Sequence, residues 1–197
     1  MNDSARMASF SGAAWPLRNA RDEDIPELEE LIARSVLGLQ AAYYTAAQMN
    51  AAIGKVFGVD RQLIRDGTYF VAEHSATAGS EPGLIVGCGG WSRRRTLYGS
   101  DGGRVGEDPP LDPGVDAARI RAFFVHPEWA RRGIARSILQ RCEAELQQAG
   151  FRRAEIVATL PGEPLYAAFG YSSDRPATLP LPDGGSIEGV HMSKRFS

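Results

Sequence analysis

Apolar residues at helical spacing dominate the pattern near the start of the chain. A first helix is predicted from apolar positions that share one face and follow acidic residues suited to a helix start: Ile25, Leu28, Leu31 and Ile32. The alanine-rich stretch Thr45–Val56 predicts a second helix, and Trp15–Arg18 can begin a strand ahead of both. This part of the chain therefore predicts a strand followed by two helices.

The period of the pattern changes from Thr68 onward. Thr68–Glu73 and Leu84–Trp91 have the apolar character of two strands, joined as in a hairpin by a Ser, Thr, Gly and Pro segment. The glycines at 87, 89 and 90 would weaken an ordinary strand, so they predict that something packs close to that backbone. The stretch Arg95–Ala117 is rich in glycine and poor in apolar residues, which predicts a long surface loop of a functional or mobile kind.

Strand character returns at Arg119–Val125, where alternation breaks near the two phenylalanines and predicts a β-bulge. A long helix is predicted from near Arg132 to about Gln148, with a stripe of apolar residues along one side. Ala154–Thr159 predicts a strand, and a short helix starts near Pro164 and ends at Gly170. Ser186–Arg195 alternates in the manner of a last strand.

This order of elements predicts an α/β (α+β) protein. Its mixed, centrally antiparallel sheet would hold about six to seven strands, with about four helices on both faces. The strand–helix–strand unit at 119–159 should be parallel or near it. With 197 residues and 43% hydrophobic content, the chain is long enough for one sizeable core. We expect a single domain over 14–197, preceded by a loose N-terminal tail at 1–13.

Composition argues against several classes of partner and cofactor. The formal net charge is -2 and the pI is near 6.0, so no global field attracts nucleic acid or a membrane. Both cysteines, Cys88 and Cys142, lie in apolar stretches, which favours inert thiols and a reducing, cytoplasmic compartment. The first residues lack the apolar run of an export signal. The histidines lack metal-ligand spacing, so we expect no metal site.

A candidate ligand site follows the strand that ends at Val125. An arginine-rich turn leads into the long helix, where free backbone N–H groups and the positive helix end meet. Gly133 would let a ligand approach the main chain, and Ala135 keeps the next contact small. Positive charge comes from three arginines: Arg131, Arg132 and Arg136. Such a turn can bind phosphate, although a simple cap of a solvated helix start gives the same short motif.

At this point the sequence resembles the GNAT family of acetyl-CoA-dependent N-acetyltransferases. The family motif, Gln/Arg-x-x-Gly-x-Gly/Ala, opens a helix directly after a strand that ends in Val-x-Pro. The segment 125–135, Val-His-Pro-Glu-Trp-Ala-Arg-Arg-Gly-Ile-Ala, matches every marked place except Ala130, where the family usually has Gln or Arg. A second mark, Leu-Tyr-Ala-Ala-Phe-Gly-Tyr at 165–171, is similar to the family's Tyr-x-x-x-Gly-Phe/Tyr signature. The resemblance extends from the first strand to about Tyr171.

The resemblance implies a donor site. The strand end would hold the pantetheine arm and the acetyl carbonyl through main-chain groups of Phe123, Phe124 and Val125. The residues from Arg131 to Arg136, Ile134 among them, would wrap the pyrophosphate of acetyl-CoA. Tyr166 would lie near the thioester sulfur. A phenol of reference pKa about 10 is a reasonable general acid for a departing thiolate, whose reference pKa is about 8.5.

The implied reaction transfers an acetyl group from acetyl-CoA to a primary amine by direct attack in a ternary complex. An alkyl ammonium of reference pKa about 10.4 must first lose a proton. The candidate general bases are three carboxylates, reached directly or through water: Glu73, Glu155 and Glu163. Thr159 occupies the place, seven residues before Tyr166, where the family often has asparagine.

The acceptor is not written in a motif. It would be shaped by Tyr43–Val59, by the Arg95–Ala117 loop and by the last strands. A small-molecule amine or polyamine is the preferred acceptor, because a long loop could close over a small ligand but would obstruct a peptide groove. The alternatives are a protein or peptide N-acetyltransferase and a non-catalytic acyl-CoA-binding sensor. If the protein forms an oligomer, we expect a homodimer.

Overall fold

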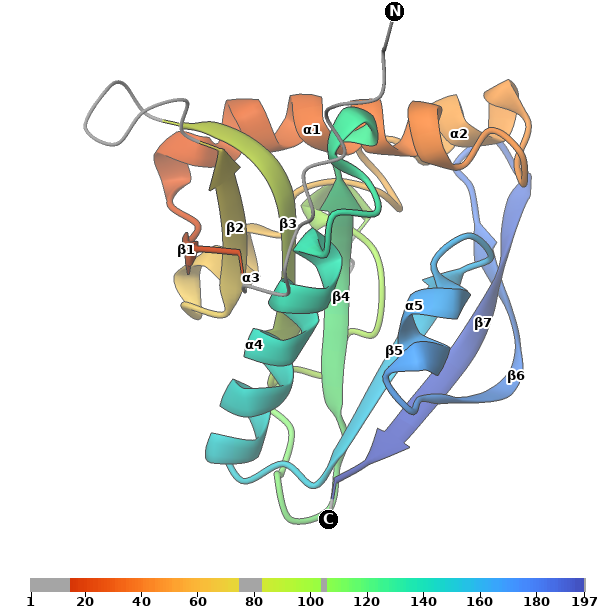
Figure 1. The fold of residues 1–197 in the computed structure, drawn as a ribbon. Helices are drawn as coiled ribbons and strands as arrows, with labels where there is room; N and C mark the ends of the chain where they lie inside the picture. Colours follow the sequence, from red (N-terminus) through yellow and green to blue (C-terminus); the bar gives the residue numbers. More distant parts are fainter. Residues whose placement is uncertain (1–14, 75–82, 104–105, 197) are drawn as a thin grey trace, which may run out of the picture.

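The computed structural model describes residues 15–74, 83–103 and 106–196, so the predicted tail at 1–13 lies outside the described residues. One sheet has the strand order β1-β2-β3-β4-β5-β7-β6 (Figure 1). Its strands are β1 Leu17–Asn19, β2 Tyr69–His74, β3 Leu84–Ser92, β4 Ala118–Val125, β5 Arg153–Thr159, β6 Ser172–Pro180 and β7 Ser186–Arg195. Neighbouring strands are antiparallel except for the parallel pair β4 and β5.

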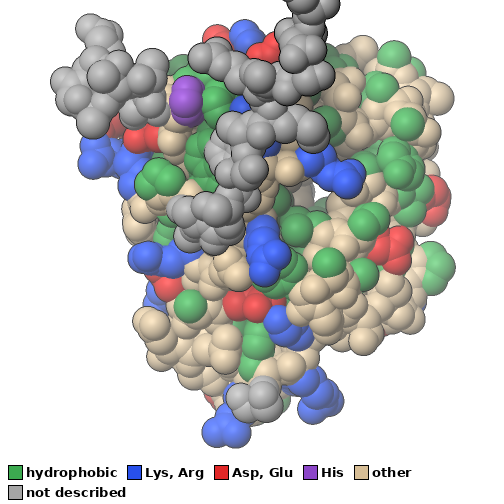
Figure 2. Space-filling view, viewed as in Figure 1, with side chains coloured by type: hydrophobic (Ala, Val, Ile, Leu, Met, Phe, Trp, Pro, Cys, Tyr) green, Lys and Arg blue, Asp and Glu red, His purple; other side chains and the backbone are tan. Residues whose placement is uncertain are grey.

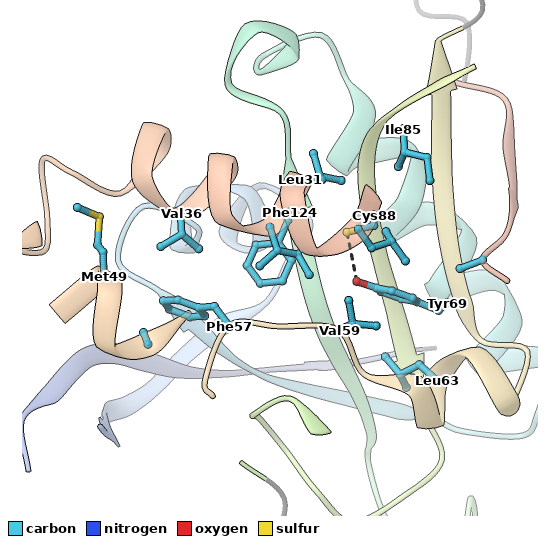
Figure 3. Close-up of a cluster of buried hydrophobic side chains, with 14 of the residues drawn as sticks. Leu31, Val36, Met49, Phe57, Val59, Leu63, Tyr69, Ile85, Cys88 and Phe124 are labelled. Atoms are coloured by element: carbon cyan, nitrogen blue, oxygen red, sulfur yellow. Dashed lines mark hydrogen bonds between the residues drawn. The ribbon is translucent and has the colours of Figure 1, made fainter. Parts of the chain in front are cut away.

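Helices cover both faces of this sheet. The α-helices are α1 Ile25–Leu39, α2 Ala46–Ala52, α3 Arg61–Arg65, α4 Ile134–Gln148 and α5 Glu163–Ala168, and the short 3-10 helices are η1 Asp22–Asp24, η2 Asp101–Gly103 and η3 Pro127–Trp129. Residues of α1 and α2, such as Val36 and Met49, pack on one face together with Phe124 (Figure 3). Residues of α4 and α5, such as Ile138 and Tyr166, pack on the other face.

A β-bulge in β4 decides which of its residues face which helical layer. Ala122 has a φ of 56°, and the pairing of β3 with β4 shifts register between Cys88 and Gly90. In a regular strand Ile120 and Phe124 would share a face, but Ile120 packs on the α4 side and Phe124 on the α1 side. The predicted bulge is confirmed.

The glycines of β3 allow side chains to lie directly on its backbone. A Cβ on Gly87 would come within 2.4 Å of the Ile134 side chain, and one on Gly89 within 2.8 Å of the Phe123 ring. The close packing predicted from these glycines is confirmed. These contacts seat the end of β4 and the first residue of α4 directly against β3.

The fold class predicted from the sequence is confirmed, including the antiparallel β2–β3 hairpin and the parallel unit formed by β4, α4 and β5. Two elements were not predicted as such. α3 is only five residues long, too short to show a helical period, and it begins where the Asp60 side chain accepts the Gln62 N–H. β6 is an exposed edge strand with Pro176 inside it, so it lacks the alternation of a half-buried strand.

The two cysteines are buried, as predicted. Burial raises the pKa of the Cys88 thiol to about 12, and the Tyr69 hydroxyl donates to its Sγ at 3.2 Å (Figure 3). Burial likewise raises the pKa of Cys142 well above its usual value. Both thiols therefore stay protonated and inert at neutral pH.

The described parts of the stretch 95–117, residues 95–103 and 106–117, lie in a loop that is anchored at several points. Just before it, the Arg94 guanidinium pairs with Asp66 at 2.7 Å. Within it, the Ser100 hydroxyl donates to the Lys55 carbonyl at 2.8 Å, and Ser100 is only 2% exposed. The predicted surface loop is thus present, and its described part is held against the rest of the protein by these contacts.

Charged side chains of both signs are mixed on the face of the molecule that Figure 2 shows. Figure 2 shows Lys and Arg side chains interspersed with Asp and Glu on the face in view. This mixing agrees with a formal net charge of -2 made from 22 basic and 24 acidic residues. No described helix combines the length and apolar character that a membrane crossing needs.

Candidate active site

The sheet opens along the seam between β4 and β5. Cα pairing between these strands is limited to Ala118 with Ala154 and Arg119 with Glu155, at their N-terminal ends. Beyond that point the strands diverge (Figure 1), and β5 continues to pair with β7 along its whole length. Parallel neighbours that separate leave main-chain groups of β4 without sheet partners. The seam is therefore the place where a ligand can bind to a strand end.

A cavity of about 200 Å³ occupies this seam and reaches both helical layers. Its wall includes three residues predicted from the sequence to hold the donor arm: Phe123, Phe124 and Val125. Ala135 and Tyr166 line it from the α4 and α5 side, and Gln40 and Phe57 line it from the α1 and α2 side. The cavity therefore connects a region near the start of α4 with the opposite face of the sheet.

The end of β4 carries a main-chain donor that faces this seam. His126 donates its N–H to Val86 on β3 at 2.9 Å, so the N–H of the preceding Val125 points to the opposite side. There it meets the Ser35 hydroxyl of α1, which accepts it at 3.2 Å. Ser35 is 4% exposed and lines the cavity. A polar group of a ligand in the seam can accept a hydrogen bond from this N–H if it displaces the Ser35 hydroxyl.

The turn before α4 has the backbone of an anion site. Arg131 has a φ of 65° and Gly133, the N-cap of α4, has a φ of 84°. No side chain caps the helix, so the N–H groups of its first turn keep their hydrogen-bonding capacity for a ligand. The side chains of Arg131, Arg132 and Arg136 are exposed beside this turn. The sequence-predicted anion-binding residues thus lie together at one helix start.

Aromatic side chains brace this turn from below. The Trp15 indole N–H donates to the Arg132 carbonyl at 2.8 Å, and the Trp15 main-chain N–H donates to the Ser137 hydroxyl at 3.1 Å. The Arg132 guanidinium lies 4.6 Å from the Trp129 ring centre, and Trp129 contacts Trp15 edge-on. A residue far away in the sequence therefore fixes the shape of the turn.

Tyr166 lies at the cavity wall opposite the end of β4. It is 4% exposed, and its ring packs edge-on against the rings of Phe123 and Tyr171. The distances between ring centres are 6.1 Å and 5.8 Å. Its hydroxyl makes no hydrogen bond within the described residues. Burial, together with the nearby Cys142 thiol, raises the pKa of Tyr166 well above its usual value. The phenol is therefore protonated at neutral pH and can donate a proton or a hydrogen bond into the cavity.

Two of the candidate bases lie away from the cavity wall. Glu73, near the end of β2, accepts from the Arg18 guanidinium at 2.8 Å and belongs to a strand two places from the seam. Glu163, at the start of α5, accepts from the Ser173 hydroxyl at 2.7 Å. Both carboxylates are engaged by neighbours outside the wall.

Glu155 has the most direct route to the seam among the three candidates. It precedes Val157 by two residues on β5 and so shares its strand face, and Val157 lines the cavity. Its carboxylate pairs with Arg119 and lies 3.5 Å from His191 Nε2. Glu155 itself is not part of the wall. A proton could reach it only through an intervening group such as water.

The opposite end of the cavity is built from separate segments. Val56, Phe57 and Gly58 follow α2, Leu97, Tyr98 and Gly99 come from the loop, and Leu179 comes from β6. All three segments expected to shape the acceptor site therefore contribute to the wall. Thr159 lines it as well, in the place where the family often has asparagine.

A buried ion pair supports this end of the cavity. Arg121 of β4 pairs with Asp60 at 2.9 Å, and their side chains are 2% and 0% exposed. The same guanidinium donates to the Gly99 carbonyl at 2.5 Å, which ties the loop to β4. Arg121 of β4 therefore holds the part of the cavity wall that the loop contributes.

Sequence reasoning missed three residues of this site: Trp15, Ser35 and Gln40. Ser35 lies within α1, Gln40 caps its C-terminal end and Trp15 precedes β1, so no local signal separates them from ordinary core, cap or loop residues. Their importance comes from contacts across the fold, such as the 122 positions between Trp15 and Ser137. Within the described ranges, no group of three or more His, Cys, Asp or Glu residues could hold a metal ion.

Comparison with known proteins identifies the family. The sequence matches the acetyltransferase (GNAT) domain over residues 65–173, more than half of the chain. The chain therefore belongs to the GNAT family and is an acyltransferase of the N-acetyltransferase class. A search of curated protein sequences finds no match.

Solved structures with the same fold are distant in sequence. A GCN5-related N-acetyltransferase from Rhodopseudomonas palustris is 19% identical, with a TM-score of 0.65 over 93% of this chain and 97% of that one. The PaiA N-acetyltransferase from Thermoplasma acidophilum, solved with coenzyme A, is 12% identical, with a TM-score of 0.60 over 93% and 100%. The ribosomal-protein-S18-alanine N-acetyltransferase from Escherichia coli is 15% identical, with a TM-score of 0.51 over 92% and 94%.

Proposed function

We propose that this protein transfers an acetyl group from acetyl-CoA to the primary amine of a small molecule, by direct attack in a ternary complex. The observation that carries the proposal is the cavity in the β4–β5 seam. It joins the donor residues at the end of β4 to Tyr166 and to a wall built partly by the loop. The PaiA enzyme of the same fold was solved with coenzyme A, which supports a coenzyme A thioester as donor.

The donor would be held mainly by the main chain. Backbone N–H groups of the turn from Arg131 to Arg136 suit a pyrophosphate, since they lie at an uncapped helix start flanked by arginines. The Val125 N–H can bind an amide oxygen of the pantetheine arm, displacing the Ser35 hydroxyl. Because these contacts use backbone groups, Ala130 in place of the usual Gln or Arg removes a side chain but leaves the cradle intact.

Tyr166 would act as the general acid. The amine nitrogen forms a bond to the thioester carbonyl carbon, the C–S bond breaks, and the Tyr166 hydroxyl gives its proton to the departing sulfur. The nitrogen gives up one proton to the base or to water, and a proton returns to the Tyr166 phenolate, so the products are the amide and the thiol of coenzyme A. The raised pKa of the phenol keeps it protonated at neutral pH, so its O–H is available to the sulfur as the C–S bond breaks.

The identity of the base stays a prediction. Glu155 is the preferred candidate among the three carboxylates, because it shares a strand face with the cavity-lining Val157. A water molecule in the seam could relay the proton from the amine. Glu73 and Glu163 have no comparable route, since each is engaged away from the wall.

A small acceptor fits the wall better than a peptide. Leu97, Tyr98 and Gly99 line the cavity, so the loop narrows the side from which an acceptor would enter. The enzyme from Escherichia coli acts on an alanine of a ribosomal protein, and it shares the fold at 15% identity. A peptide acceptor is therefore the second candidate, one that needs this loop to move aside.

The test is an assay of thiol release with acetyl-CoA and a panel of amines, run beside thermal unfolding with and without acetyl-CoA. Catalysis predicts amine-dependent release of coenzyme A together with stabilisation by acetyl-CoA. A binding sensor gives the stabilisation without thiol release from any amine. Absence of both effects would show that the seam does not bind the donor.

A further inference from the structure

The acceptor side of the cavity offers no negative charge. Among the described residues, its wall contains one charged side chain, Arg121, and no carboxylate. The guanidinium of Arg121 is paired with buried Asp60 at 2.9 Å, so that carboxylate is already engaged. An ammonium brought into this wall would leave water without gaining a counter-ion, which is costly. A polycationic acceptor is therefore a poor match.

Gln40 is a polar residue of the wall on the α1 side of the sheet. Gln40 stands at the C-terminal cap of α1 and is 7% exposed, and its buried side-chain Oε1 has no hydrogen-bond partner among the residues that the structure describes. Its backbone carbonyl accepts the N–H groups of Tyr43 and Tyr44, so the residue is fixed in place. A buried amide oxygen without a donor is unfavourable, and a ligand N–H would remove that cost.

The side chain of Tyr44 holds the surroundings of Gln40 in place. The Tyr44 hydroxyl donates to the Glu188 carbonyl of β7 at 2.7 Å and accepts the Leu160 N–H after β5 at 2.9 Å. These contacts join the end of α1 to the far side of the seam. Gln40 therefore faces the seam from a framework that does not need to reorganise when a ligand arrives.

We propose that the acceptor is an uncharged primary amine on an apolar body, such as an aromatic amine, and that Gln40 accepts a hydrogen bond from its amino group. This inference rests on the proposed acetyl transfer. It also accounts for the absence of a carboxylate base at the wall. An aromatic amine is already neutral at pH 7.4, whereas only about one alkylamine molecule in a thousand is.

A matched amine series tests the acceptor class. The probes are 4-methylaniline, benzylamine, 1,4-diaminobutane and a short peptide with a free N-terminus, compared by kcat/KM for thiol release at pH 7.4. We expect 4-methylaniline to exceed 1,4-diaminobutane by roughly 100-fold or more. We also expect its rate to stay level between pH 7 and pH 9, while the benzylamine rate rises about tenfold per pH unit, as its neutral form does.

The outcomes separate this inference from the proposed function. A preference for 1,4-diaminobutane or for the peptide would overturn the acceptor class and leave acetyl transfer standing. If no amine releases thiol although acetyl-CoA binds, acetyl transfer itself is wrong and the acceptor class fails with it.

Substitutions at Gln40 test the residue assignment. Gln40→Leu should raise KM for 4-methylaniline about 5- to 10-fold, the value of one hydrogen bond, without changing KM for acetyl-CoA. Gln40→Glu should shift the ratio of kcat/KM between benzylamine and 4-methylaniline at least 10-fold toward the cation. Gln140→Leu, on the exposed side of α4, is the control and should change neither. Thermal unfolding checks that both variants are folded. If Gln40→Leu then leaves KM for 4-methylaniline unchanged, as the control does, the assignment is overturned.

Discussion

The proposed donor side and the proposed acceptor side of the site are built in different ways. The proposed donor side takes the strand end and the turn from one continuous stretch, 123–136, whose arginines are exposed beside the turn and outside the cavity wall, and Tyr166 is added from α5. The acceptor side uses mostly apolar side chains from segments far apart in the chain, including Gln40, Phe57 and the loop at 97–99. A common donor can be bound through backbone geometry, whereas an individual acceptor is selected by side chains. The comparison predicts which substitutions affect which substrate.

The largest expected effect is on the donor side, at Tyr166. Tyr166→Phe should lower kcat about 10²- to 10⁴-fold at saturating acetyl-CoA, because general acid help to the departing sulfur is lost. Thiol release under saturating conditions measures it. Tyr171→Phe is the matched control, since Tyr171 is also buried and packs on Tyr166 but does not line the cavity. Equal rates for Tyr166→Phe and the parent protein would show that the phenol is only a packing group.

On the acceptor side, the largest expected effect is on stability. Asp60→Asn leaves the Arg121 guanidinium buried without its counter-ion, which should lower the free energy of unfolding by about 3 to 5 kcal/mol. Urea unfolding measures it. The control is Glu23→Gln, which removes a pair with Arg21 whose side chains are 65% and 73% exposed, and should cost under about 0.5 kcal/mol. Similar losses for both variants would mean that the buried pair does not support the loop wall.

The same difference explains how much could be predicted from the sequence. The donor turn is predictable because its requirements are local: a strand end, a residue with positive φ at Gly133, and a helix start follow one another. The bulge was visible because alternation breaks within one strand. The acceptor wall is not predictable in this way. Gln40 looks like any polar residue at a helix end, and its role depends on the seam that β4 and β5 create far along the chain.

An intermediate effect is expected at Gly133. Gly133→Ala places a Cβ where the ligand should approach, at a φ of 84°, and should weaken acetyl-CoA binding about 10-fold. Apart from its chain neighbours, no atom of the described residues lies within 4 Å of that Cβ, so the loss of stability should come from backbone strain of about 1 kcal/mol. Calorimetric titration with acetyl-CoA gives the affinity, and thermal unfolding gives the stability.

Gly184→Ala separates strain from ligand contact. Gly184 lies between β6 and β7 with a φ of 85°, and within the described ranges only its chain neighbours come within 4 Å of an added Cβ, so its strain should match that at Gly133. The affinity of the Gly184→Ala variant for acetyl-CoA should equal that of the parent protein. If the two variants lose affinity equally, the effect at Gly133 is a general consequence of destabilisation, and the turn has no special role in binding the pyrophosphate.

The smallest effect is expected where the two sides meet, at Ser35. Its hydroxyl accepts the Val125 N–H at 3.2 Å in the free protein, and the pantetheine arm would take over that N–H. Ser35→Ala removes the competing acceptor, so KM for acetyl-CoA should fall, by at most about 3-fold, because one hydrogen bond is exchanged for another. KM for the amine should not change. A rise in KM for acetyl-CoA would instead mean that Ser35 binds the donor directly, and the α1 layer would then belong to both sides of the cavity.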